Sequence, residues 1–328
     1  MAQNRQSATV FLVAVLLFCP AISAGKNRVR KSNYNYMLPS FEQQLEENEK
    51  QIRMTNSEAA QQNQYPYMVA LMLFDNETQS FNFYCGGSLI SSTQILTAAN
   101  CVCHAKTNKT LKAKEVKVAL GAHFLNETTN DAQLTKNIRR IKIHERYNPE
   151  TYFNDIAILT MASPVEFTKT ISPVCLPPQE TNDQYVGKLA IVKGWGATGW
   201  EENASNYLLH GVQSIISNSV CHKIYTGSFK ITTHMMCAYR RGIDSCHLDE
   251  GGPLVIESDD LNENNELNVI ESENNNNTEA DEAVAVEEEC RWIQVGVVSF
   301  GMGCGEKGIP GVYMRITSFL PWINKQKK

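Results

Sequence analysis

The stretch DSCHLDEGGPLV, residues 244–255, places Asp249 and Glu250 directly before two glycines and a proline. On both sides of it, the chain consists of short strand-like runs separated by turn residues. Examples are YPYMVALMLF, FNFYCGGSLI, EVKVALGAH, KLAIVKGWG and WIQVGVVSFG. Many short β-rich runs with turns between them are typical of an all-β barrel or sandwich. The final run, ITSFLPWINKQKK, has apolar residues at helical spacing, so we expect a short C-terminal helix in spite of its proline.

The length and the first residues indicate a secreted protein. The chain has 328 residues, of which 42% are hydrophobic and 20% are charged, which is ample for one large globular domain or two packed half-barrels. Arg5, the apolar run TVFLVAVLLFCPA and the small residues ISAG follow the order of a signal peptide, which we assign to residues 1–24. The alternative, a membrane anchor, needs about 20 apolar residues, more than this run has.

Secretion sets the expected modifications. Of ten cysteines, Cys19 leaves with the signal peptide. The remaining nine are an odd number, so at least one is free or bonded to another chain. Five N-x-S/T sequons predict glycosylation at Asn76, Asn108, Asn126, Asn203 and Asn276.

Two segments lack the strand pattern. Residues 25–53 are polar and predict a flexible pro-segment, or alternatively an ordered N-terminal arm. Residues 257–289 contain thirteen acidic residues and no lysine or arginine, which predicts a disordered acidic insertion, whereas the rest of the chain is net positive. This insertion serves either solubility alone or docking on a basic surface of this chain or of another protein.

Nine segments together resemble one family. They are YPYMVAL, CGGSLISS, LTAANC, NDIAIL, PVCLP, GWG, DSCHLDEGGPLV, VVSFG and PGVYMRI. Their content and order resemble the trypsin-like (chymotrypsin-fold, peptidase S1) serine proteases, with a match from about Met54 to Asn324. The resemblance implies a domain over residues 54–328 with two six-stranded antiparallel β-barrels, a cleft between them and a short C-terminal helix.

The resemblance also implies three disulfides, Cys85–Cys101, Cys221–Cys237 and Cys246–Cys304. Cys103, Cys175 and Cys290 are left over. The position of Cys175 in the family often tethers a cysteine of the pro-segment, but residues 25–84 contain none. We therefore expect Cys175 to bond another chain, with a Cys103–Cys290 bond as a further alternative.

The positions that carry catalysis in the family are changed here. Asn100 stands at the histidine position, and an amide cannot act as a general base. Asp155 matches the aspartate, Glu250 replaces the serine, and Leu248 replaces the first glycine of the oxyanion turn. We therefore predict no catalytic residue. A carboxylate dyad of Asp155 and Glu250 acting on sugars has no support elsewhere in the sequence.

Neither a metal nor a cofactor is expected. His104, His123 and His247 have no ligand spacing, and Ala122 stands where trypsins have their first calcium ligand. His247 resembles a residue on the rim of the specificity pocket.

The specificity pocket resembles that of trypsins more closely. Asp244 matches the pocket base that selects arginine or lysine, and Ser299, Gly301 and Gly311 match the walls, with Phe300 in place of the usual tryptophan. Such a pocket binds a guanidinium, unless Leu248 or Glu250 blocks it. Activation by cleavage after Arg53 is a further hypothesis, in which the new amine of Met54 pairs with Asp249.

These residues favour a secreted, catalytically inactive serine protease homologue that binds or regulates proteins of an extracellular proteolytic cascade, immune or reproductive. Its expected partners are proteases, their substrates or their inhibitors, and not nucleic acid or a membrane. The main alternative is an active endopeptidase that cleaves after arginine or lysine. A third hypothesis is a structural partner tethered through an unpaired cysteine.

Overall fold

A computed structural model describes residues 58–104, 107–125, 133–179, 181, 183–197, 203–258 and 290–326. The predicted signal peptide, the pro-segment, residues 259–289 of the acidic insertion, Arg53, Met54, Asn126 and Asn276 lie outside the described residues. Within the described residues, no helix is both long and apolar enough to cross a membrane.

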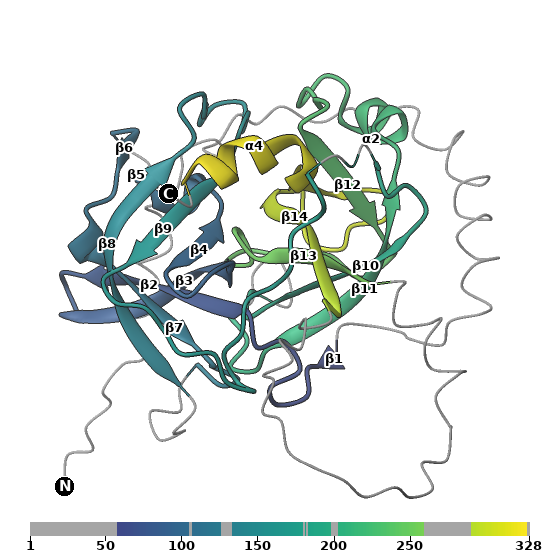
Figure 1. Cartoon of the computed structure of the whole chain (residues 1–328). Helices are drawn as coiled ribbons and strands as arrows, with labels where there is room; N and C mark the ends of the chain where they lie inside the picture. Colours follow the sequence, from purple (N-terminus) through teal and green to yellow (C-terminus); the bar gives the residue numbers. More distant parts are fainter. Residues whose placement is uncertain are drawn as a thin grey trace, which may run out of the picture.

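The first half of the domain is a closed antiparallel barrel (Figure 1). Its strands, in order around the barrel, are β2 (Met68–Asp75), β3 (Ser80–Leu89), β4 (Gln94–Thr97), β9 (Ala157–Met161), β8 (Leu134–Ile143) and β7 (Val116–Leu120). Apolar residues of these strands point inward and are fully buried, among them Val69, Leu71, Ile95, Val118 and Leu159. The alternation of the sequence therefore fills the barrel interior.

The second half is also a six-stranded barrel. Its strands are β11 (Leu209–Ile216), β10 (Leu189–Gly194), β13 (Pro253–Glu257), β14 (Trp292–Phe300), β15 (Gly311–Arg315) and β12 (Met235–Tyr239), and the pairing of β12 with β11 closes it. The short strand β1 (Glu58–Ala59) adds to the outside of β11, and β5 (Cys103–His104) pairs with β6 (Lys109–Thr110). The prediction of two six-stranded barrels is confirmed.

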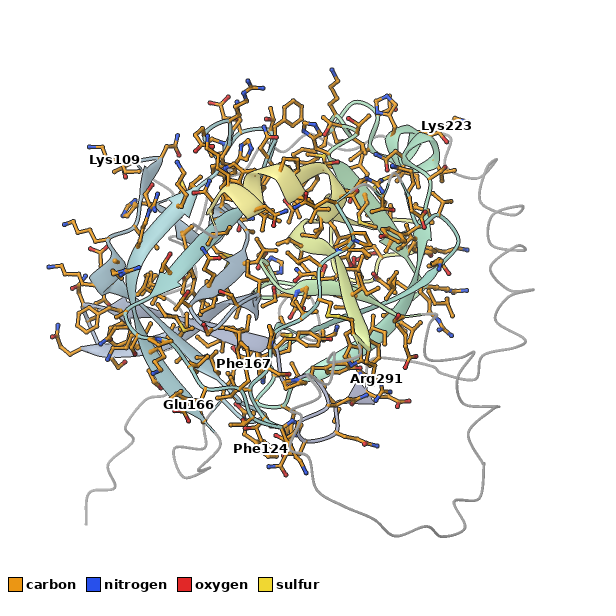
Figure 2. The ribbon with its side chains drawn as sticks, viewed as in Figure 1. Lys109, Phe124, Glu166, Phe167, Lys223 and Arg291 are labelled. Atoms are coloured by element: carbon orange, nitrogen blue, oxygen red, sulfur yellow. A yellow bond between two sulfur atoms is a disulfide. The ribbon has the colours of Figure 1, made fainter. Side chains whose placement is uncertain are left out.

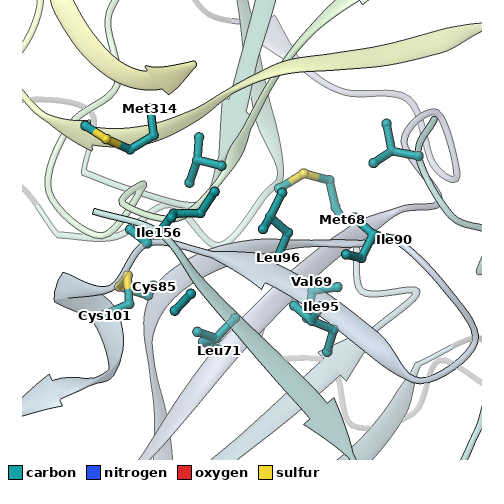
Figure 3. Packing of buried hydrophobic residues seen from close by; sticks show 14 of the residues in the cluster. Met68, Val69, Leu71, Cys85, Ile90, Ile95, Leu96, Cys101, Ile156 and Met314 are labelled. Atoms are coloured by element: carbon teal, nitrogen blue, oxygen red, sulfur yellow. A yellow bond between two sulfur atoms is a disulfide. The ribbon is translucent and has the colours of Figure 1, made fainter. Parts of the chain in front are cut away.

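One core cluster joins the barrels. Figure 3 shows Met314 of β15 near Ile156, which precedes β9, and both residues are fully buried. The C-terminal helix α4 (Ile316–Gln326) continues directly from β15 and buries Phe319, Leu320 and Ile323. Pro321 lies inside this helix, which confirms the predicted helix in spite of the proline.

Three short helical segments complete the described elements. They are η4 (Asn100–Val102), η5 (Ala113–Glu115) and α2 (Asn218–Tyr225). The Ser217 side chain caps α2 by accepting a hydrogen bond from the backbone N–H of Val220. The sequence reading did not identify α2, because only Cys221 and Tyr225 of its eight residues are buried and the apolar pattern is short.

The described residues form four disulfides. Three are the pairs that the resemblance implies. The fourth joins Cys175 to Cys290, with Cα atoms 5.8 Å apart, so the expected bond from Cys175 to another chain and the Cys103–Cys290 alternative are both wrong. The reason is local pairing. The backbone at Cys175 bonds to Trp292 and Gln294, which brings Cys290 beside it although 115 residues separate the two cysteines.

The start of the acidic insertion also needs a correction. Glu257 belongs to β13, where it pairs with Trp292 and forms an ion pair of 3.2 Å with Arg291, which is labelled in Figure 2. Ser258 still donates a backbone hydrogen bond to Arg291. The segment without described structure therefore begins at residue 259, not at 257.

Candidate functional site

The residues of the candidate site come from both barrels. Asn100 begins η4 just after β4, and Asp155 lies two residues before β9, so the first barrel supplies both. Ser299 lies near the end of β14, and Leu248 and Glu250 lie in the loop before β13, so the second barrel supplies these three. Hydrogen bonds between Asn100, Asp155 and Ser299 join the two halves.

The Asn100 side chain is held as a double donor. Its Nδ2 donates to Oδ2 of Asp155 at 2.9 Å and to the carbonyl oxygen of Ser299 at 3.0 Å. The Asn100 backbone N–H also donates to Oδ1 of Asp155, at 2.8 Å. Both amide hydrogens are therefore used, and the amide nitrogen has no lone pair available to accept a proton.

Asp155 is the buried acceptor at the centre of this group. It is fully buried, and Ser299 Oγ donates to its Oδ2 at 2.5 Å. Burial raises the pKa of Asp155 to about 7, although the hydrogen bonds from Ser299, Asn100 and Ala99 oppose the rise. A carboxylate that accepts three such bonds holds Asn100 in one orientation, which supports a structural role for Asp155.

Glu250 folds back onto its own loop. Its Oε2 accepts the backbone N–H of Leu248 at 2.7 Å. Burial raises the pKa of Glu250 to about 7, the nearby Asp249 and Asp155 raise it further, and the N–H groups of Glu250 and Leu248 oppose the rise. Backbone N–H groups in such a loop stabilise an oxyanion when they are free. Here the Glu250 carboxylate already accepts them.

Leu248 has an unusual backbone conformation for a bulky residue. Its φ is +77°, in the left-handed region that favours glycine. The loop thus keeps a glycine-like turn even though leucine occupies it, and the bond from Leu248 N–H to Glu250 favours this turn. Strain of this kind persists only where neighbouring contacts determine it.

The Asp249 carboxylate bonds to backbone groups of the second barrel. It accepts the N–H of Gly196 at 2.8 Å and that of Cys246 at 2.9 Å. A Cβ atom at Gly194 or Gly196 would collide with this carboxylate, which explains the two glycines of the GWG segment. Burial raises the pKa of Asp249 to about 6. Asp249 lines a cavity together with Asp244, His210 and Gly305.

Three of the predicted pocket residues, Asp244, Gly301 and Gly311, lie close together, whereas the Ser299 side chain bonds to Asp155. Asp244 Oδ1 accepts the N–H of Ser245 at 2.9 Å, and Oδ2 accepts that of Gly305 at 3.3 Å. A Cβ atom would lie 3.9 Å from Oδ2 if placed on Gly301 and 2.6 Å from Oδ1 if placed on Gly311. Burial raises the pKa of Asp244 to about 7. We call the space bounded by Asp244, Gly301, Gly305 and Gly311 the Asp244 slot.

An aromatic cluster beside the site was missed by the sequence reading. Phe300 lies 4.9 Å from Phe229 and 5.0 Å from Tyr152, measured between ring centroids, and 6.0 Å from Tyr225. These rings come from four separate segments, so only the substitution at Phe300 is visible in the sequence. The cluster fills the region next to Ser299 with apolar surface.

A buried lysine was also missed. Lys193 of β10 is 2% exposed, its Nζ donates to the Tyr67 hydroxyl at 3.0 Å, and it lies over the rings of Tyr65 and Tyr67 at 4.6 and 5.2 Å. Burial lowers the pKa of Lys193 well below its usual range. The sequence shows only a lysine in an apolar run, which gives no signal of this aromatic surround.

Three side chains have the composition of a metal site. One ligand atom from each of Cys246, His247 and Cys304 lies within 4.8 Å of the others. The two sulfurs are bonded to each other, so they are not thiolates and the disulfide form is a poor set of metal ligands.

The described sequon residues Asn76, Asn108 and Asn203 are exposed, as glycan attachment requires.

Comparisons with known proteins place these observations in a family. A family model described as Trypsin matches residues 54–323. The Proclotting enzyme of Tachypleus tridentatus is 30% identical over 263 residues, which cover 79% of this chain and 62% of that protein. Serine protease filzig of Drosophila melanogaster is 32% identical over 244 residues, 73% of this chain and 12% of that protein. Clotting factor C of Tachypleus tridentatus is 27% identical over 281 residues, which cover 82% of this chain and 25% of that protein. The chain therefore spans less than two thirds of each relative.

Proposed function

This chain belongs to the trypsin family of serine proteases, and from that premise we propose that it acts by binding other proteins and does not hydrolyse peptide bonds. One observation carries the proposal: the groups at the catalytic positions are bonded to one another. Asn100 donates both amide hydrogens to Asp155 and Ser299, and Glu250 accepts the N–H of Leu248. Proteolysis in this family needs a base, an activated hydroxyl and free oxyanion donors. The side chains at the three catalytic positions, Asn100, Asp155 and Glu250, include no hydroxyl, and the Asn100 amide cannot act as a base.

The main alternative is an active endopeptidase that cleaves after arginine or lysine. This alternative is supported by three residues that match the family pattern, Asp155, Ser299 and Asp244. Against it, the Glu250 carboxylate is a much weaker acyl-transfer nucleophile than an activated serine, and the Asn100 amide cannot take up a proton. We therefore favour binding over cleavage.

We further propose that the partners are proteins of an extracellular proteolytic cascade. Two relatives are named for clotting, Proclotting enzyme and Clotting factor C, which supports a cascade of this type. Four disulfides and the N-terminal signal-like segment support an oxidising, extracellular location. The partner classes are proteases, their substrates and their inhibitors.

Cleavage after Arg53 is part of the same proposal. Glu58, four residues after Met54, pairs with His210, which lines the cavity beside Asp249. Four residues of extended chain span about 13 Å, so Met54 has the reach to bring a new amine to this cavity. An ammonium there would pair with the buried Asp249 carboxylate and lower its raised pKa.

The test is depletion and replacement in the extracellular fluid of the producing organism. An antibody removes the chain, the cascade is triggered, and the release of a chromophore from an arginine amide substrate reports total protease activity. We expect depletion to change this activity and purified protein to restore it. Unchanged activity after depletion would overturn the proposed place in a cascade.

A chemically treated sample separates binding from cleavage. Purified protein is exposed to a fluorophosphonate, which blocks serine proteases irreversibly, and the excess reagent is removed before replacement. Binding predicts that treated and untreated protein restore the activity equally and that neither sample hydrolyses the arginine amide substrate by itself. Restoration by untreated protein alone would support the endopeptidase and contradict our proposal.

A further inference from the structure

The Cys246–Cys304 disulfide has a histidine against both of its sulfurs. Nδ1 of His247 lies 3.7 Å from Sγ of Cys246 and 3.7 Å from Sγ of Cys304. The backbone fixes this position, because the His247 carbonyl accepts the N–H of Ala197 at 2.9 Å. Within the part of the chain that the structure describes, no other disulfide has a recorded imidazole contact.

This disulfide is also within reach of a small molecule. His247 and Cys304 are partly exposed, and both cysteines line the cavity beside Asp244 and Asp249. By contrast, all four cysteines of the Cys85–Cys101 and Cys221–Cys237 bonds are at most 4% exposed. The Cys175–Cys290 bond is exposed at Cys290 but has no recorded imidazole contact, so it separates the effect of exposure from that of the histidine.

The loop that carries Cys304 is rich in glycine. It joins β14 to β15, and Gly303, Gly305 and Gly308 in it have φ values of +103°, +69° and +76°. Glycines move through such conformations with little steric cost. Gly305 also donates to Asp244, and a Cβ atom placed on Gly301 of the same loop would lie 3.9 Å from the Asp244 carboxylate. The disulfide therefore fixes one wall of the Asp244 slot.

We propose that the Cys246–Cys304 disulfide is a thiol-exchange site whose reduction opens the Asp244 slot. The co-reactant is a small extracellular thiol, R–SH, of the cysteine or glutathione class. His247 Nδ1 accepts the thiol proton, and the thiolate attacks Sγ of Cys304. The Cys246–Cys304 bond breaks, an R–S–S–Cys304 bond forms, and Cys246 leaves as a thiolate paired with the imidazolium of His247.

The second half of the exchange completes the reduction. His247 returns its proton to Cys246, and a second R–SH attacks the mixed disulfide. This step releases R–S–S–R and leaves Cys304 as a thiol, so two thiols are oxidised and one protein disulfide is reduced. Burial lowers the pKa of His247, which keeps the imidazole neutral at neutral pH. The thiol exchange does not depend on the proposed binding function. The opening of the Asp244 slot rests on that function, because it would regulate binding.

The test compares the four disulfides inside one molecule. The secreted protein is incubated with reduced glutathione at pH 7, quenched by alkylation at intervals and mapped by mass spectrometry. We expect Cys246 and Cys304 to be alkylated about tenfold faster than Cys175 and Cys290. Equal rates, or faster reduction of the exposed Cys175–Cys290 bond, would overturn the proposal.

Two histidine variants show whether the imidazole is the cause. His247→Phe should lower the reduction rate of Cys246–Cys304 about tenfold at pH 7, while the remaining rate still rises with pH as the attacking thiol ionises. The matched control is His222→Asn, because His222 follows Cys221 in the chain but is exposed. This control should leave all four rates unchanged. An unchanged rate in His247→Phe would contradict the role of His247.

Benzamidine, a small arginine mimic, tests the second half of the proposal. After selective reduction and alkylation, we expect saturable benzamidine binding that Asp244→Asn abolishes. Complete reduction of Cys246–Cys304 without binding would show that the disulfide does not hold the slot closed. Neither result depends on whether the chain hydrolyses peptides, so failure here is distinguishable from failure of the proposed function.

Discussion

At the scale of single residues, Glu250 determines the state of the loop before β13. Its carboxylate accepts the Leu248 N–H and lies near Asp249 and Asp155, whose charges raise its pKa. A carboxylate in this position is stabilised by backbone donors and destabilised by burial and by like charges. The charge state of Glu250 is therefore linked to the conformation of this loop.

A neutral replacement of Glu250 should stabilise the protein at high pH. The pKa of Glu250 is raised from 4.5 to about 7, so the folded state keeps a proton that the unfolded state loses between these values. Stability from this group is therefore present at low pH and is lost as pH rises through about 7. We expect Glu250→Gln to exceed the wild type in free energy of unfolding by about 1–3 kcal/mol at pH 8 and to match it at pH 4.5.

Denaturant unfolding at several pH values measures this difference. The control is Glu166→Gln, an exposed carboxyl labelled in Figure 2, which should change the free energy of unfolding by less than about 0.5 kcal/mol. A Glu250→Gln variant that is less stable than the wild type at pH 8 would show that the charged carboxylate stabilises the loop, contrary to our account.

The sequence predicts replaced residues at the catalytic positions, because Asn100, Leu248 and Glu250 lie inside segments whose neighbouring residues match the family pattern. It was not sufficient to place their side chains. The return of Glu250 onto the Leu248 N–H depends on one rotamer and on the left-handed turn at Leu248, and neither follows from residue type alone.

At the scale of elements, strand β10 contains a buried lysine, Lys193. Lys193 is 2% exposed, and its Nζ contacts the Tyr67 hydroxyl and the faces of two tyrosine rings. Such contacts offset only part of the cost of removing an amine from water. We therefore expect Lys193 to lower the free energy of unfolding relative to an apolar side chain at this position.

Replacing this lysine with an apolar residue of similar length should stabilise β10. We expect Lys193→Met to raise the free energy of unfolding by about 1–2 kcal/mol at pH 7, because methionine fills the space without the cost of desolvation. Guanidinium unfolding measures the change. Lys169→Met, at an exposed position, should have no effect beyond about 0.5 kcal/mol. A loss of stability in Lys193→Met would mean that the aromatic contacts outweigh desolvation.

The Cys175–Cys290 disulfide joins the segment before β10 to the start of β14. Removing both sulfurs as Cys175→Ala/Cys290→Ala should lower the free energy of unfolding by about 2–4 kcal/mol, because the bond closes a long loop. Calorimetry measures the loss, and non-reducing peptide mapping of the wild type should recover Cys175 linked to Cys290. In a Cys103→Ala control the same linked peptide should remain. Recovery of Cys175 bonded to a second chain would contradict the structure.

Some of these elements could be predicted from the sequence and others could not. Strands of both barrels were predictable, because runs such as YPYMVALMLF and WIQVGVVSFG are apolar, rich in β-formers and bounded by turns. The Cys175–Cys290 bond was not, because 115 residues and an acidic segment lie between the cysteines, and only the pairing of residue 175 with Ile293 brings them together. Helix α2 was missed because its buried face is two residues wide.

At the scale of the whole molecule, the barrels bring four carboxyl groups with raised pKa values to one region. They are Asp155, Asp244, Asp249 and Glu250. The described contacts of Asp155, Asp249 and Asp244 are hydrogen bonds with backbone or neutral side chains. A cationic partner group would lower these raised pKa values, which agrees with our proposal that this chain acts by binding other proteins.

Access to Asp244 should be restricted in the uncut, oxidised protein. The carboxylate already accepts the N–H groups of Gly305 and Ser245, so an amidine would have to compete with both hydrogen bonds. We expect calorimetric titration with benzamidine to show no saturable binding in this form. A saturable isotherm that Asp244→Asn abolishes would show that the slot is already open.

The most direct test of the central claim is to ask whether the site reacts as a serine protease. The secreted protein, cut after Arg53 so that Met54 is the new N-terminus, is incubated with a fluorophosphonate and with arginine and lysine ester substrates, beside trypsin as the positive control. Our account predicts no phosphonyl adduct by intact-mass measurement and no ester hydrolysis above background, because Asn100 supplies no base and Glu250 holds the oxyanion donor. An adduct that maps to the cleft, with turnover that Asp244→Asn removes, would contradict it.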